Sequence, residues 1–189
     1  MYVCVPPHIC LAGAFNDPDY LLLQDAGGRS AQTAQQARLQ FSVYAMLAAP
    51  LIISQDLART QSNPYALQTL LNKEVIAVDQ DVLGIQGTKI IGLNFTSCAS
   101  EPVCVCVWMR RLDAGRFAIL FANAGTGTSD NIAVTGDLLA LTTGLPPSQT
   151  MRMHDLWAGT NSTIKLGDGF LSGTLGPAAV EMHVMTPVF

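Results

Sequence analysis

The pattern of the sequence changes near Gly87, and this change constrains the fold more than any other feature. Before Gly87, short apolar runs alternate with helical patterns. From Thr88 onward, helical periodicity is absent and short strand-like runs recur between turn residues. Alternating strands and helices predict parallel β-α units, whereas successive short strands predict an antiparallel sandwich. We therefore expect two domains, residues 1–87 and residues 88–189.

The first part is predicted to contain two β-α units. A helix over 31–49 follows the N-cap residue Ser30 and is stopped by Pro50. The apolar run 51–54 has no alternation, which is typical of a strand buried on both faces. A second helix begins at Asn63, and 74–81 continues as a helix or a turn. Two such units cannot bury their own faces, so they must belong to something larger.

The second part is predicted to be a sandwich of about eight strands. Asp113-Ala114-Gly115 is expected to form a tight hairpin turn between the second and third of them, and 123–127 and 144–147 are expected to be loops. The expected strands lie at 89–95, 103–109, 116–123, 131–135, 151–157, 163–166, 170–174 and 180–185.

Composition excludes several classes of protein. The chain is 49% hydrophobic and only 13% charged, so much of it must be buried and disorder is not expected. The net charge of −4 and the absence of a Lys/Arg cluster argue against nucleic acid as a partner. The longest uncharged stretch, 39–55, contains Pro50 and several polar side chains, so no membrane span is expected. The N-terminus lacks the basic and apolar regions of a signal peptide.

The cysteines and histidines do not predict a metal site. The five cysteines have no C-x-x-C spacing, and His8, His154 and His183 are far apart in the sequence, so neither a metal nor another cofactor is expected. Cys98 and Cys104 flank a short loop. A Cys98–Cys104 disulfide is one interpretation, and free buried thiols are the other.

Two tripeptides match the glycosylation sequon, with Asn94 and Asn161 as the acceptors. They favour a secreted or lysosomal setting for the protein.

The run Asn16-Asp17-Pro18-Asp19 places an amide and two carboxylates around a rigid proline. We expect Asn16 and Asp17 to end a strand and Asp19 to begin a loop. Fixed polar groups at such a junction are what a sugar pocket needs, because its acceptors must not move. The alternative is an acidic turn on the surface with no ligand.

Several segments resemble glycoside hydrolase family 27, the α-galactosidases and α-N-acetylgalactosaminidases. The resemblance runs in order from Ala14 nearly to the end of the chain. The segments that carry it are Phe15-Asn16-Asp17-Pro18-Asp19, Gln40-Phe41-Ser42, Ala48-Ala49-Pro50-Leu51-Ile52-Ile53, Asp56-Leu57, Asn72 to Asp81, Leu83-Gly84, Gln86-Gly87, Val107-Trp108, Phe121-Ala122-Asn123 and Asp155-Leu156-Trp157-Ala158-Gly159.

The resemblance implies the last two β-α units of a (β/α)8 barrel followed by an antiparallel β-sandwich. It also implies that Asp19 lines the pocket for terminal galactose and that Tyr20 touches the sugar. Asp17 is a further candidate for substrate binding. The family usually has tryptophan where this chain has Phe15. A galactoside-type carbohydrate is thus the expected partner. The sequence leaves open the choice between galactose and N-acetylgalactosamine, and it leaves open the oligomeric state.

The resemblance also implies that the chemistry is missing from this chain. The family uses two aspartates about 5 Å apart as nucleophile and acid/base, and both lie upstream of the asparagine-aspartate-proline-aspartate run. A barrel needs about 250 residues, which 87 cannot supply. We therefore expect a fragment that does not catalyse the reaction alone.

The competing interpretation is a non-catalytic carbohydrate-binding or interaction module built on the sandwich. Trp108 and Trp157 are either its stacking platform or core residues. His154 and Asp155 do not suggest a catalytic triad, because adjacent strand residues point to opposite faces.

Overall fold

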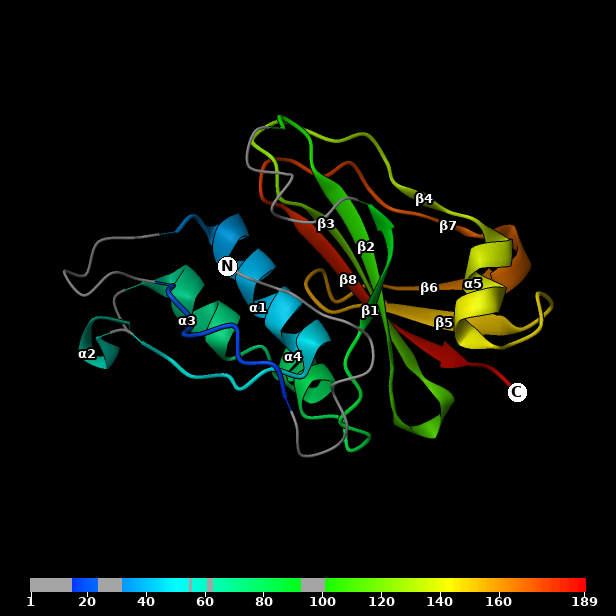
Figure 1. Cartoon of the computed structure of the whole chain (residues 1–189), viewed down its shortest axis with the longest axis horizontal. Coiled ribbons are helices and arrows are strands. Elements are labelled where there is room, and N and C mark those ends of the chain that lie inside the picture. Colours follow the sequence, from blue (N-terminus) through cyan, green and yellow to red (C-terminus); the bar gives the residue numbers. More distant parts are fainter. Residues whose placement is uncertain (1–14, 24–31, 55, 61–62, 93–100) are drawn as a thin grey trace.

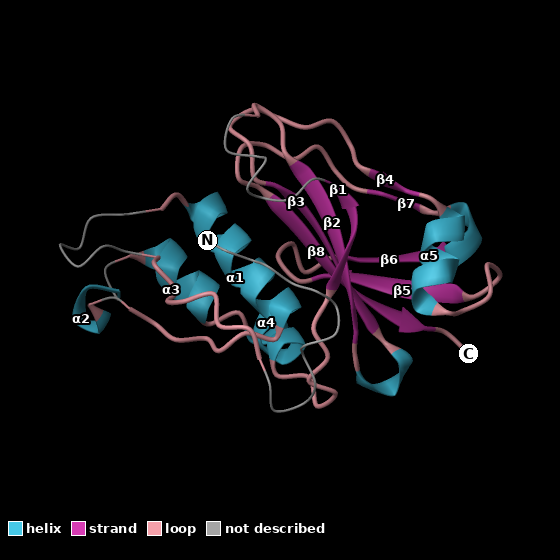
Figure 2. Ribbon diagram, in the orientation of Figure 1, coloured by secondary structure: helices cyan, strands magenta, loops and turns pink. Residues whose placement is uncertain are grey.

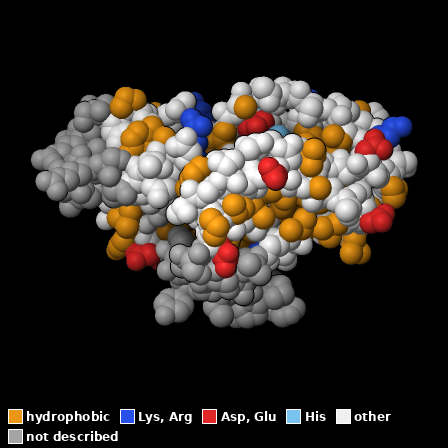
Figure 3. Space-filling model, turned by 90° about the horizontal axis from the view of Figure 1, so that it is seen from above, with side chains coloured by type: hydrophobic (Ala, Val, Ile, Leu, Met, Phe, Trp, Pro, Cys, Tyr) orange, Lys and Arg blue, Asp and Glu red, His pale blue; other side chains and the backbone are white. Residues whose placement is uncertain are grey.

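The computed structural model describes residues 15–23, 32–54, 56–60, 63–92 and 101–189. A helical part lies on one side of a long antiparallel sheet, and a small second layer lies on the other side (Figure 1). Among the described helices, α1 to α4 precede the sheet in the chain and lie together on one side of it, whereas α5 follows β4 and lies apart from them (Figure 2). None of the described helices is long and apolar enough to cross a membrane. Charged side chains are sparse on the face shown in Figure 3.

The helix expected over 31–49 is α1, Ala34–Leu47. It begins later than predicted because Thr33 and Gln36 form a capping box, each side chain accepting a hydrogen bond from the other's backbone N–H, at 3.2 and 2.8 Å. The predicted cap, Ser30, lies outside the described residues. Ala48 ends the helix in the left-handed conformation ahead of Pro50.

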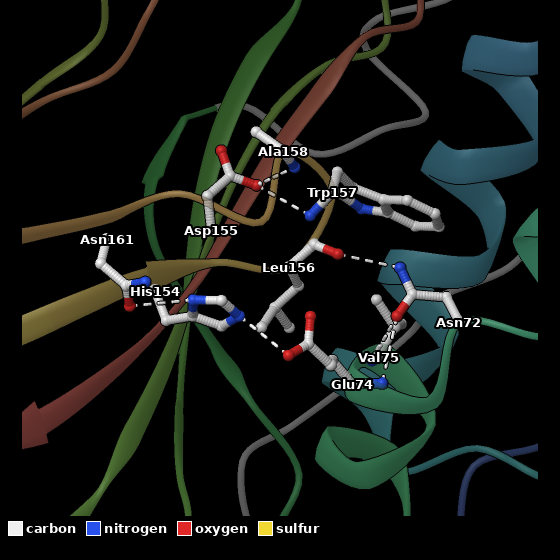
Figure 4. Close-up of polar contacts among 9 residues, drawn as sticks. All are labelled: Asn72, Glu74, Val75, His154, Asp155, Leu156, Trp157, Ala158 and Asn161. Atoms are coloured by element: carbon white, nitrogen blue, oxygen red, sulfur yellow. Dashed lines mark hydrogen bonds and ion pairs between the residues drawn. The ribbon is translucent and has the colours of Figure 1, made fainter.

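Three short helices follow α1. The unpredicted α2 spans Leu57–Thr60, and α3 spans Pro64–Leu70 with Asn63 as its N-cap, as the sequence indicates. The segment expected as a helix or a turn is α4, Lys73–Asp79. Its N-cap residue Asn72 also donates from Nδ2 to the Leu156 carbonyl at 2.9 Å, which ties α4 to the sheet (Figure 4).

The two expected parallel strands meet in a single parallel bridge between Leu21 and Ile53. The Leu21 N–H donates to the Ile52 carbonyl at 2.8 Å, and the Ser54 N–H donates to the Leu21 carbonyl at 3.3 Å. Pairing thus occurs after the acidic turn, and not before it as predicted. Pro18 has no N–H for a ladder, and two parallel strands without flanking strands sustain little pairing.

The second part contains the eight strands expected from the sequence, with shifted bounds. Six form one antiparallel sheet in the order β1-β2-β3-β8-β5-β6, and β4 pairs with β7 in a separate two-stranded sheet. The bounds are Thr88–Gly92 (β1), Val105–Arg111 (β2), Phe117–Asn123 (β3), Ala133–Val134 (β4), Thr150–Asp155 (β5), Asn161–Lys165 (β6), Phe170–Leu171 (β7) and Val180–Pro187 (β8).

Two connections show where turn chemistry decides the structure. The hairpin turn predicted at Asp113-Ala114-Gly115 is present as a 3-10 turn, η2, Asp113–Gly115, with positive φ at Ala114 and Gly115. A helix, α5, spans Gly136–Thr143 where no helix was expected. Thr135 caps its start and Gly144 ends it, so the signals existed, but eight residues are too few to show helical periodicity. A second 3-10 turn, η3, spans Leu166–Asp168.

Both faces of the large sheet are buried. One face shares a core with α1 and α4, and the other packs on β4, β7 and α5. Trp108 belongs to the first core and is 7% exposed. Trp157 donates from Nε1 to Ser42 Oγ at 3.0 Å, and the Arg38 guanidinium stacks on its ring. Neither tryptophan is presented to solvent as a flat stacking platform.

Arg110 connects the sheet to the ends of two helices. It lies on β2, is 1% exposed, and donates to the Ala45 carbonyl in the last turn of α1 and to the Asp79 carbonyl at the end of α4, the latter at 3.2 Å. Helix C-termini carry partial negative charge, so a buried guanidinium between two of them is favoured. Beside it, the Gly87 N–H donates to the Met46 carbonyl at 2.7 Å.

The carboxylate of Asp79 is less well accommodated. Gln80 Nε2 donates to Asp79 Oδ2 at 2.5 Å, but Asp79 Oδ1 is buried without a hydrogen-bond partner. Burial raises the pKa of Asp79 to about 6, against the opposing effects of the Gln80 hydrogen bond and the Arg110 charge. The folded protein therefore holds a proton on Asp79 more tightly than the unfolded chain does.

Replacing Arg110 by methionine should destabilise the protein. The substitution keeps the apolar stem but leaves two helix-end carbonyls without their charged donor, so we expect a loss of about 2–4 kcal/mol. Urea denaturation monitored by circular dichroism measures it. Arg111→Met is the matched control, since Arg111 is the exposed next residue of β2. Equal denaturation midpoints for the two variants would contradict this role of Arg110.

Asp79→Asn should stabilise the protein at neutral pH. Because the pKa of Asp79 is raised, its contribution to stability is complete below about pH 4 and is lost as the pH rises through about 6. The variant should gain about 1–2 kcal/mol at pH 7.5, and the difference should vanish towards pH 4. Asp81→Asn is the control. The Asp81 carboxylate accepts a hydrogen bond from the Asp113 N–H, so this substitution should destabilise the protein. Melting curves across this pH range test both signs.

Candidate functional site

The acidic turn is organised by its own side chains. Asp17 Oδ1 accepts from the Asp19 N–H at 3.0 Å, and Asp19 Oδ1 accepts from the Tyr20 N–H at 2.9 Å. Asp19 has a φ of 79°, a conformation that aspartate tolerates better than most residues. The turn is therefore tight, and one oxygen of each carboxylate is engaged by the backbone.

Helix α1 holds this turn from behind. The Tyr44 hydroxyl donates to the Pro18 carbonyl at 2.9 Å, and Gln40 Nε2 donates to the Tyr20 carbonyl at 3.2 Å. Gln40 Oε1 in turn accepts from the Leu22 N–H at 3.1 Å. Two side chains one helical turn apart thus fix the backbone on both sides of Asp19.

The negative charge of the turn also affects the pKa of Tyr44. Its side chain is buried in the core shared by α1 and the sheet. Burial raises the pKa of Tyr44 and the charges of Asp19 and Asp17 raise it further, while a hydrogen bond from Gln40 acts in the opposite direction. Tyr44 therefore remains a neutral hydrogen-bond donor at physiological pH.

The structure brings the predicted site residues Asp17, Asp19 and Tyr20 together and exposes all three. Asn16, half-buried beside them, donates from Nδ2 to the side chain of Gln86. The outer oxygens of the two carboxylates can accept hydrogen bonds from a polyhydroxylated ligand, and Tyr20 offers a ring and a hydroxyl. These groups can bind and orient a sugar.

Sequence reasoning assigned no role to Gln40 and Tyr44. The usable signal was their spacing: residues four apart lie on one helix face, and a polar pair there must find partners. Nothing in the sequence showed that those partners would be backbone carbonyls of the acidic turn.

Exposed apolar side chains surround the turn and the parallel bridge. Tyr20, for example, is 50% exposed. A surface of this kind is expected where further structure packs. Its members are Phe15, Tyr20, Leu22, Ile52, Ile53 and Leu57.

Asp155, Glu181 and His183 form the one described cluster whose side chains could hold a metal, with ligand-type atoms within 4.8 Å of one another. In this structure they serve hydrogen bonds. His183 Nε2 lies 2.6 Å from Glu181 Oε1, and Glu181 Oε2 accepts from the Gly173 N–H at 2.7 Å. Burial alone would raise the pKa of Glu181, but these two hydrogen bonds outweigh it and hold the pKa below its usual value.

The remaining predicted sites are only partly described. Cys104 is disulfide-bonded, and its partner lies outside the described residues, as do Cys98 and Asn94. The Cys98–Cys104 pairing therefore stays a prediction. Cys106 is a free thiol, and burial raises its pKa to about 11. Asn161 is exposed on β6, where its Oδ1 contacts His154 Nδ1 at 3.0 Å.

Two protein-family models match the chain in succession. Residues 7–81 match the alpha galactosidase A model, and residues 104–185 match the alpha galactosidase C-terminal beta sandwich domain model.

Curated relatives give the same result. The chain is 31% identical to an alpha-galactosidase of Cyamopsis tetragonoloba, over 93% of this chain and 37% of that protein. It is 32% identical to an alpha-N-acetylgalactosaminidase of Gallus gallus, over 93% of this chain and 39% of that protein. The chain thus spans less than two fifths of the length of the relatives that it matches.

A solved structure supports the fold. The alpha-galactosidase of Saccharomyces cerevisiae, crystallised with raffinose, superposes with a TM-score of 0.77 at 16% identity, over 93% of this chain and 48% of the other. The two matched models follow one another in the same order as the described parts of the chain, with the helical part first and the antiparallel sheet second. The chain belongs to glycoside hydrolase family 27, of which it represents the C-terminal portion.

Proposed function

We propose that this chain is the C-terminal part of a retaining glycosidase that removes terminal α-linked galactose from oligosaccharides or glycoconjugates. Its own contribution is a sugar-binding turn and the sandwich that supports it. One observation carries the proposal: the exposed carboxylates of Asp17 and Asp19 are held rigidly beside an apolar surface that further barrel units would cover. The catalytic aspartates would come from those units.

The roles of the two aspartates differ in this proposal. Asp19 accepts hydrogen bonds from sugar hydroxyls, and Tyr20 contacts the sugar ring. Asp17 maintains the turn through its bond to the Asp19 N–H. The identity of the relatives does not separate galactose from N-acetylgalactosamine, because enzymes named for each are equally similar to this chain. A secreted or lysosomal setting, suggested by the sequons, is part of the proposal.

A non-catalytic binding module is less well supported. Such a module would present aromatic side chains on an open sheet face. In the described structure, Trp108 lies in the core and Trp157 is engaged by Ser42 and Arg38.

The isolated 189-residue chain should not hydrolyse a chromogenic α-galactoside. The family's paired aspartates are expected upstream, and without both of them no covalent sugar intermediate forms. Turnover is measured against a mock preparation and against the Asp19→Ala variant. Turnover clearly above the mock would overturn this expectation, and its loss in Asp19→Ala would place chemistry on the acidic turn.

In a protein completed with the six upstream units, Asp19→Ala should lower kcat/KM for an α-galactoside by roughly 10- to 100-fold, the cost of removing a charged acceptor. Asp19→Asn should recover part of this loss, because its amide oxygen still accepts. Asp17→Ala should instead lower the melting temperature, because it removes the bond that closes the turn. An Asp19→Ala variant with normal kinetics would remove Asp19 from the site.

A further inference from the structure

A groove of about 460 Å³ lies between α4 and the part of the large sheet formed by β5, β6 and β8. Its apolar lining residues include Val78, Leu112, Leu156 and Val184, and polar side chains line the rest of it. It shares no residue with the acidic turn, and its lining contains no residue singled out above for sugar binding.

The acidic side chain that lines the groove, Glu74, is already engaged. His154 Nε2 lies 2.9 Å from Glu74 Oε1, and His154 Nδ1 lies 3.0 Å from Asn161 Oδ1 (Figure 4). The imidazole thus bridges α4 and β6, and it holds the Glu74 carboxylate towards the sheet.

The two arginines that line the groove, Arg116 and Arg152, are less firmly engaged than Glu74. Arg116 reaches the Asp81 carboxylate at 3.4 Å and donates from Nε to the Asp113 carbonyl at 3.1 Å. Arg152, exposed on β5 two residues before His154, has no hydrogen bond or ion pair with the described residues. The groove therefore presents a guanidinium that no described residue engages, beside apolar lining residues.

We propose that this groove binds a sugar-sized ligand that carries an oxyanion, either a carboxylate or a phosphate. Arg152 is the principal contact, because a free guanidinium binds such groups through two parallel N–H donors. Arg116 and the Thr186 hydroxyl supply further donors, and the apolar lining residues accommodate the less polar face of a sugar ring. The site is independent of the proposed glycosidase activity.

The test compares ligands that differ in the charged group alone. Calorimetric titrations of the bacterially produced chain, which carries no glycan at Asn161, use galacturonate, galactose 6-phosphate, galactose and inorganic phosphate. At least one of the two charged sugars should bind about 10-fold or more tightly than galactose, and its binding should weaken as NaCl is added. Which of them binds identifies the oxyanion.

Variants assign the binding to the groove. Arg152→Gln should reduce the affinity about 10-fold or more, while Arg152→Lys should retain part of it. Arg111→Gln is the matched control for charge, because Arg111 is exposed on β2 and does not line the groove. It should leave the affinity unchanged, and melting curves confirm that each variant is folded.

Three results would overturn the proposal. The first is equal binding of galactose and both charged sugars, or no binding of either charged sugar. The second is an Arg152→Gln variant that binds like Arg111→Gln. The third is inorganic phosphate binding as tightly as galactose 6-phosphate, which would remove the sugar from the ligand.

Discussion

The buried guanidinium of Arg110 fixes how the helices sit on the sheet. It is a charged group on the central part of a strand, and it donates to two carbonyls, one at the end of α1 and one at the end of α4. A shift of either helix by one turn would leave the cation buried without acceptors, at a cost larger than that of most core substitutions. The apolar core around it favours contact between the helices and the sheet but is compatible with more than one register between them. The hydrogen bonds of Arg110 fix that register.

The same arrangement explains why Asp79 tolerates an unpartnered oxygen. The backbone carbonyl of Asp79, and not its carboxylate, accepts from Arg110, so the two opposite charges share a region without forming an ion pair. The nearby cation lowers the cost of burying the carboxylate, yet burial still dominates and the pKa is raised. The contact that positions the end of α4 therefore leaves the Asp79 carboxylate buried with one oxygen unpartnered.

The sequence predicted features that are encoded within a few residues. The Asn63 cap, the Asp113–Gly115 hairpin turn and the strand succession each follow from local residue types. Sequence reasoning did not predict features that depend on distant residues or on very short segments. The start of α1 depends on a capping box that competes with Ser30, and α5 is too short to show periodicity. The prediction that 51–54 is a strand buried on both faces was wrong for the described structure: Ile52 and Ile53 are each 42% exposed, and the run pairs through a single bridge because no further described strand lies beside it. For the candidate site, the motif located Asp17, Asp19 and Tyr20, whereas the groove has no sequence signal because its lining is assembled from four separate segments.

Helix α1 connects the acidic turn to the sheet. Its polar pair, Gln40 and Tyr44, fixes the backbone of the acidic turn, and one residue further on Ala45 accepts from Arg110 of the sheet. A displacement of the sheet would therefore reach the turn through a single rigid helix, without passing through a flexible loop. In a complete barrel, the turn would also be restrained by the preceding strand, so the sheet would act as a second, independent restraint on Asp19. If Asp19 binds the sugar as proposed, this arrangement gives the sandwich a physical role in the proposed enzyme: through α1, it holds the carboxylate of the acidic turn in place.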